Sequence, residues 1–182
     1  MNQKYDINTN YRSIFPAPFY RRNMVEEDKI MGLDCYIVHG NDRDKAFTHE
    51  DDERLKDISL CGGMFSGSGS DGSFRGKVYD PIIQELSEGK HTWYIQQDED
   101  AYIPSVALKE QADLLAELIQ TKIEYIEDTG ETYDDDTIMY TTRSNSNYTP
   151  FDGEEFTLKE IRDLETLLRV AAERGAVMVV WY

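Results

Sequence analysis

Cysteine and histidine are scarce in this sequence. Its 182 residues include two cysteines and three histidines. Cys35 and Cys61 are too few for a disulfide framework, and His39, His49 and His91 do not have the spacing of zinc ligands. The composition therefore predicts a reduced compartment and no structural metal.

Long apolar runs are missing as well. The longest, residues 176–182, is too short to cross a bilayer, and no basic-then-apolar leader opens the chain. We therefore expect no membrane anchor and no signal peptide, and a cytoplasmic location.

Positive charge is the third deficit. The chain has 19 Lys and Arg against 36 Asp and Glu, which gives a net charge of −17. This balance excludes a broad grip on nucleic-acid phosphates or on an anionic membrane. Hydrophobic residues still make up 40% of the chain, enough for the core of one domain.

Residues 1–30 differ from the remainder in charge. They carry a net charge of +1, whereas residues 31–182 carry −18. Two prolines within residues 15–20 prevent a continuous helix there. We predict an extended N-terminal arm over residues 1–30 and a single globular domain over residues 31–182. The arm either packs across its own domain or reaches a second copy in a homodimer.

Hydrophobic periodicity predicts the main elements of the domain. Apolar residues alternate over 33–38, as in a strand, and recur at helical spacing over 105–126. Residues 176–182 are apolar on both faces, which indicates a central strand.

A second main helix is predicted from its ends. Thr157 and Glu160 have the spacing of a capping box, and Gly175 lies where a helix stops. Together these elements predict an α+β fold with a mixed or antiparallel sheet packed on two main helices.

Shorter elements are predicted between these. The charged segment 49–57 is expected to be a solvated loop or a hairpin tip. A short helix is expected between Pro81 and Gly89, because proline disfavours a helix that begins before it. Short strands are expected over 93–95 and 138–142.

A Gly/Ser-rich loop carries one motif. Gly67, Gly69 and Gly72 have the GxGxxG spacing of a dinucleotide-binding loop, and the cations Arg75 and Lys77 follow. That motif needs a helix at its third glycine, which the nearby proline disfavours, and the spacing to the lysine does not fit a Walker loop. Two interpretations stay open: a site for a phosphate-bearing ligand, or salt bridges from the two cations to acidic residues of the same chain.

No catalytic constellation is visible. The acidic run 134–136 lacks the alternating oxygen ligands and central glycine of a calcium loop. Both cysteines lie in apolar stretches typical of inert thiols, and no nucleophile elbow follows a good strand. We assign no catalytic residue, metal or cofactor, and expect a non-enzyme rather than an enzyme.

Negative charge is concentrated in residues 96–136, which hold 13 acids and two lysines. On the predicted long helix the acids lie opposite the apolar stripe, about 5 Å apart along the axis. Such a row competes for a protein groove built for phosphates, although solubility alone also explains an acidic surface. The predicted partner-binding residues are Glu110, Asp113, Glu117, Glu124, Asp134, Asp135 and Asp136.

Four stretches carry a resemblance. They are MGLD at 31–34, CGGMFSG at 61–67, DGSFRGKVY at 71–79 and the closing WY at 181–182. In these the chain resembles small proteins of bacteriophages and their bacterial hosts that commonly begin at the MGLD. The resemblance implies a phage or mobile-element gene expressed in a bacterial cytoplasm, with residues 1–30 as an addition. It implies no activity and no site residue.

These observations favour one function over another. Small acidic phage proteins without a catalytic signature resemble anti-defence inhibitors, including anti-CRISPR proteins. We therefore expect a non-enzymatic inhibitor whose acidic face docks a basic nucleic-acid-handling protein, such as a CRISPR effector nuclease. The alternative is a small enzyme or sensor that binds a phosphate-bearing ligand at the Gly-rich loop.

Overall fold

A computed structural model describes six stretches of the chain. They are residues 33–38, 49–62, 73–93, 102–129, 138–142 and 155–181, without the side chains of residues 49, 129 and 181. The predicted arm over 1–30, the three glycines of the Gly/Ser loop, most of the predicted strand 93–95 and the acidic run 134–136 lie outside these stretches.

The larger sheet has three antiparallel strands in the order β1-β5-β2. These are β1 (Asp34–Val38), β5 (Val177–Trp181) and β2 (Tyr102–Ile103). The predicted strand over 33–38 is confirmed, and the C-terminal apolar run forms the central strand, as expected. In β5, Met178 and Val180 are fully buried, so this side of the strand faces the core.

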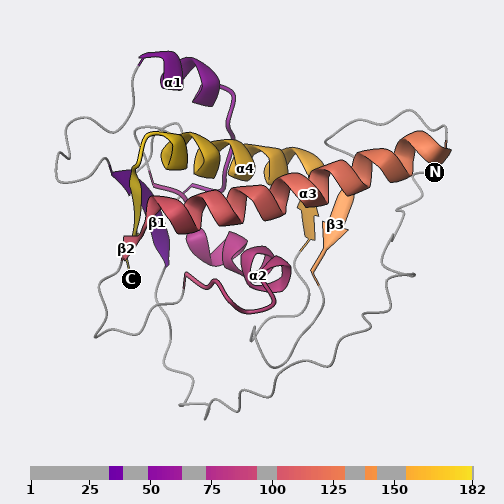
Figure 1. Cartoon of the computed structure of the whole chain (residues 1–182), viewed down its shortest axis with the longest axis horizontal. Helices are drawn as coiled ribbons and strands as arrows, with labels where there is room; N and C mark the ends of the chain where they lie inside the picture. Colours follow the sequence, from indigo (N-terminus) through magenta and orange to yellow (C-terminus); the bar gives the residue numbers. More distant parts are fainter. Residues whose placement is uncertain are drawn as a thin grey trace, which may run out of the picture.

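Two long helices cover the sheet (Figure 1). α3 (Ser105–Thr129) and α4 (Leu158–Glu173) pack against each other through apolar stripes. The buried members of these stripes include Leu108, Ala112, Leu115, Leu164 and Leu167. The expected α+β fold with two main helices is therefore confirmed, and all the strand pairs described are antiparallel.

The capping box at the start of α4 is present. The Thr157 hydroxyl accepts a hydrogen bond from the Glu160 amide at 3.1 Å, and the Glu160 carboxylate accepts one from the Thr157 amide at 2.8 Å. After α4, Gly175 adopts a positive φ of 66°. A glycine takes this conformation without strain, so it ends the helix and directs the chain into β5.

A two-stranded antiparallel sheet precedes α4. It pairs β3 (Met139–Thr141) with β4 (Glu155–Thr157), and Tyr140 lies opposite Phe156. The sequence predicted β3 but not β4, which is only three residues long and continues directly into the helix.

Two predictions about local structure are wrong. Residues 49–57 are not simply a loop, because α1 (His49–Leu55) lies there, and its Asp51 is fully buried with a 2.9 Å hydrogen bond from Arg174. α2 (Gly76–Leu86) begins before Pro81 and contains it. In both cases tertiary contacts outweigh the local sequence signal.

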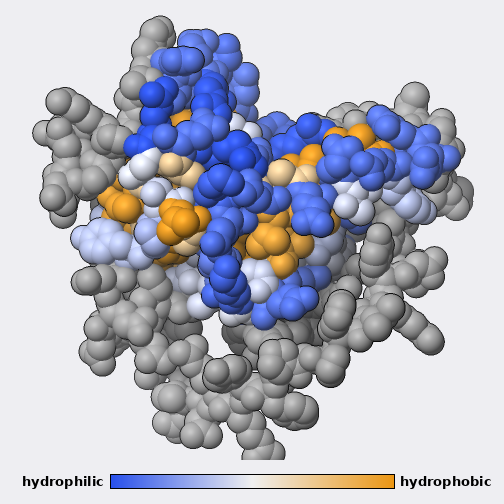
Figure 2. Space-filling view, in the orientation of Figure 1, coloured by the Kyte–Doolittle hydropathy of each residue, from blue (hydrophilic) through white to orange (hydrophobic). Residues whose placement is uncertain are grey.

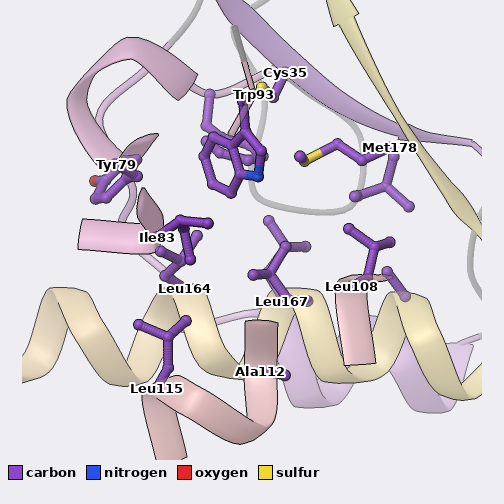
Figure 3. Close-up of a cluster of buried hydrophobic side chains, with 14 of the residues drawn as sticks. Cys35, Tyr79, Ile83, Trp93, Leu108, Ala112, Leu115, Leu164, Leu167 and Met178 are labelled. Carbon is purple, nitrogen blue, oxygen red and sulfur yellow. The ribbon is translucent and has the colours of Figure 1, made fainter. Parts of the chain in front are cut away.

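The core lies between the sheet and the helices. Figure 3 shows Trp93 among Tyr79 and Ile83 of α2, Leu167 of α4 and Met178 of β5. Trp93 also meets the ring of Phe74 edge to face, with the centroids 5.8 Å apart. Large apolar side chains from distant parts of the sequence thus share one core.

Gly76 provides a test of this packing. A Cβ atom at this position would lie 2.3 Å from the Cys35 sulfur and 2.6 Å from Leu33 Cδ2. We expect Gly76→Ala to lower the free energy of unfolding by about 3 kcal/mol, because overpacking outweighs the gain in helix propensity. Gly62→Ala is the matched control, since its Cβ would meet nothing within 4 Å. Urea unfolding of both variants checks this, and equal stabilities would contradict the described packing.

The C-terminal strand provides a second test. Removing residues 179–182 deletes the β5 partners of Asp34, Cys35 and Tyr36 in β1 and of Tyr102 in β2. It also removes buried Val180, which alone contributes about 1.5–3 kcal/mol. We expect the truncated protein to unfold or become insoluble. Deletion of residues 1–30 is the comparison, and we expect it to keep the fold. Circular dichroism and thermal melting measure both, and a soluble C-terminal truncation with an unchanged Tm would overturn the expectation.

Candidate protein-binding face

Exposed acids line the side of α3 opposite its buried stripe. Glu110, Asp113, Glu117 and Glu124 lie there, and all four are exposed. We call this set the acidic face. Asp134, Asp135 and Asp136, the other predicted partner-binding residues, lie outside the described residues. The structure thus brings the four helical acids together in one row, as helical periodicity predicts.

Cations of the same chain pair with Glu110. The amino group of Lys90 lies 2.7 Å from its carboxylate and His91 Nε2 lies 3.0 Å away. The hydrogen bond from Lys90 is the main cause that lowers the pKa of Glu110. This carboxylate therefore stays ionised, but its charge is partly balanced by the turn that follows α2.

Asp113 is paired in the same way. It accepts hydrogen bonds from Lys109 at 2.6 Å and from Arg169 of α4 at 3.0 Å. These contacts lower its pKa, with Lys109 as the larger cause. Glu110 and Asp113, the N-terminal half of the acidic face, are therefore both held in intramolecular ion pairs.

The far half of the face is different. Glu117, Glu124, Glu127 and Asp128 are exposed, and within the described residues none of them has a cation as partner. Glu124 accepts a hydrogen bond from Gln120, which is neutral. We call these four residues the free acidic end.

Two of these residues were not among the predicted site residues. The predicted helix stopped near residue 126, whereas α3 continues to Thr129 and carries Glu127 and Asp128. Asp128 follows Glu117 and Glu124 at offsets of 11 and 4, so it extends the same face. The three carboxylates span about 16 Å along the axis. Figure 2 shows mostly hydrophilic surface over this end of the helix.

Arg75 is bound within the protein. Its Nε lies 2.9 Å from Asp34 Oδ1, and the Asp34 side chain is 5% exposed. The Lys77 amide, in the first turn of α2, donates to the Leu33 carbonyl at 3.2 Å. An anion at this helix start would compete with both contacts. The alternative ligand site at Gly67, Gly69, Gly72, Arg75 and Lys77 stays a prediction, because its glycines lie outside the described residues.

The two cysteines differ in environment. Cys35 is buried, and burial raises its pKa well above its usual value, with the nearby carboxylates of Asp80 and Asp34 as smaller causes. Its thiol is therefore a poor nucleophile. Cys61 is exposed, and its amide donates to the Tyr79 hydroxyl oxygen at 2.8 Å. Across the described ranges no group of three or more His, Cys, Asp or Glu residues is placed to hold a metal.

Asp80 forms a buried polar cluster that sequence reasoning missed. Its side chain is completely buried and accepts hydrogen bonds from the Trp93 amide, from Gln84 Nε2 and from Thr92 Oγ1. Burial is the main cause that raises its pKa to about 6, and the three hydrogen bonds act in the opposite direction. An Asp one residue before a proline gave no sequence signal for this role.

Comparison of the chain with protein-family models, with curated proteins and with solved structures gives no match. Among the described residues, no helix combines the length and the apolar character that a membrane span needs.

Replacing Arg75 tests whether its ion pair is structural. Arg75→Ala removes the guanidinium that lies 2.9 Å from the buried Asp34 carboxylate, and we expect a loss of about 1–3 kcal/mol of stability. Arg54→Ala is the control, because Arg54 pairs at 2.7 Å with Glu173, whose side chain is 49% exposed. That pair should contribute less than about 1 kcal/mol. Chemical denaturation measures both losses, and equal losses would argue against a structural role for Arg75.

Proposed function

We propose that this protein is a non-enzymatic inhibitor that docks a basic nucleic-acid-handling protein through the acidic face of α3. The concrete partner class is a CRISPR effector nuclease. This class fits because such a partner holds a groove of cations that normally contacts phosphates. The context of a phage or mobile-element gene, implied by the sequence resemblance, supports the same choice.

The free acidic end is the observation that carries the proposal. Its carboxylates have no cation partner within the described residues, whereas Glu110 and Asp113 are paired. An unpaired carboxylate gains more from a partner's Lys or Arg than one that must first give up an internal ion pair. We therefore place the centre of the contact at Glu117, Glu124 and Asp128 rather than along the whole helix.

The mechanism is competition for a phosphate-binding groove. A rigid helix presents its carboxylates at fixed spacing, so the row loses little conformational entropy on binding. The net charge of −17 adds long-range attraction to a basic protein and speeds association. No bond is made or broken, and inhibition lasts for the lifetime of the complex.

Charge reversal of the free acidic end tests this. We expect E117K/E124K/D128K to weaken binding to a purified effector nuclease by at least 100-fold and to restore its DNA cleavage, because attraction becomes repulsion. The control is D52K/E53K/D57K, which reverses three exposed acids in and beyond α1. Each variant takes the net charge from −17 to −11, so the two are matched in total charge.

Binding is measured by surface plasmon resonance against a panel of effector nucleases, at low and high salt. We expect the association rate of the wild type to fall steeply with salt. Circular dichroism first confirms that both variants are folded. If the two variants lose affinity equally, or if neither does, the acidic face is not the docking surface.

A further inference from the structure

The turn after α2 brings two cations to the acidic face. Glu88 and Gly89 adopt positive φ angles of 53° and 80°, which reverse the chain, and the His91 amide donates to the Ser87 hydroxyl at 3.0 Å. The reversal places Lys90 and His91 against the Glu110 carboxylate of α3. Residues 87–93 therefore act as a cover over the first acid of the face.

Hydrogen bonds to buried side chains hold the end of this turn in place. The Trp93 amide and the Thr92 hydroxyl donate to the carboxylate of Asp80 in α2, and the Trp93 indole donates to Gln111 Oε1 of α3 at 3.1 Å. Gln84 donates both to the same carboxylate and, at 3.2 Å, to the Thr92 hydroxyl. Asp80 thus accepts hydrogen bonds from both sides of the turn.

We propose that Asp80 is a pH-sensitive clasp which holds the 87–93 turn closed and thereby keeps Lys90 and His91 over Glu110. When the clasp opens, Glu110 loses its internal partners and joins the free acidic end. The clasp itself stands on the contacts above, whereas its effect on a partner rests on the proposed function.

The sign of the pH dependence follows from burial. In the closed turn Asp80 has a pKa of about 6, and after opening it meets water, where the ordinary value is 3.8. The closed form therefore binds more protons between these values, and opening becomes more favourable as the pH rises through them. The opening constant should increase roughly tenfold between pH 5 and pH 7 and then level off.

The other titratable groups near the clasp come from β1 and from the turn. In β1, the Cys35 thiol lies near Asp80. The carboxylates of Asp80 and Asp34 both raise the pKa of this thiol. Gln84, Thr92 and Gln111 are neutral. On the turn, Lys90 and His91 face Glu110. Because the His91 imidazole lies on the same turn, 3.0 Å from Glu110, it requires its own control.

The experiment uses the full chain and no partner. Hydrogen exchange by NMR gives the protection factor of the Trp93 amide at pH 5 and pH 7, and the carboxyl carbon of Asp80 is titrated directly. We expect the Asp80 carboxyl to titrate with a midpoint near pH 6. The protection factor of the Trp93 amide should be about tenfold lower at pH 7 than at pH 5. Asp80→Asn keeps the size and one acceptor oxygen, and its protection factor should change less than twofold over this range.

Two further variants keep the test decisive. Thr92→Val removes one donor to the carboxylate, so the Asp80 midpoint should move to higher pH. His91→Gln removes the imidazole of the turn and should retain the tenfold change.

An Asp80 midpoint near pH 4 in the wild type would overturn the proposed clasp. So would a Trp93 protection factor that is the same at pH 5 and pH 7. A tenfold change in the Trp93 protection factor that disappears in H91Q but persists in D80N would also overturn it. Failure of the charge-reversal experiment with this pH dependence intact would instead reject the proposed function and leave the clasp standing.

Discussion

The pairing of β5 with two neighbours is the constraint on which the rest of the described structure depends. β5 bonds to β1 on one side and to β2 on the other, so it joins segments that are far apart in the sequence. Its inward side chains, Met178 and Val180, lie in the same core as Trp93. Figure 3 shows Met178 in this core. Because these pairings are non-local, the sheet closes only when the whole domain is present.

The sheet also determines where the acidic end lies. β2 leads into α3 through Pro104, and α4 leads into β5 through Gly175, so both helices are attached to the sheet at the same end (Figure 1). α3 has 25 residues and α4 has 16, and α3 therefore extends beyond its neighbour. Arg169 of α4 reaches Asp113 but no residue of the projecting end among the described contacts. The difference in helix length thus leaves the last acids of α3 without cations from α4.

Local patterns predicted the elements whose cause is local. The capping box at Thr157 and Glu160 involves residues three apart, and the stripe of α3 follows from helical periodicity alone. The failures have distant causes. Asp51 is buried and binds Arg174, which is 123 residues away. The first residue of α2, Gly76, packs against Cys35 and Leu33 of a distant segment, where a Cβ atom would clash.

The candidate site also has features with a local cause, which the sequence predicts, and features with a distant cause, which it does not. Periodicity correctly placed Glu110 and Glu117 on one exposed face. It gave no means of distinguishing them, because the partners of Glu110 come from the turn after α2, and the position of that turn depends on a tertiary contact. A charge count over the helix treats a paired and an unpaired carboxylate alike, whereas a binding partner meets mainly the unpaired ones.

The buried carboxylate of Asp80 explains why that turn has a defined position. Apolar contacts are non-directional, so packing around Trp93 alone would tolerate several arrangements of the chain that precedes it. The hydrogen bonds that the Trp93 amide and the Thr92 hydroxyl donate to Asp80 are directional, so they select one arrangement of this segment. Burial of a charge costs stability at neutral pH, as the raised pKa of Asp80 reflects. The domain therefore gives up some stability to fix the place where Lys90 and His91 meet the acidic face.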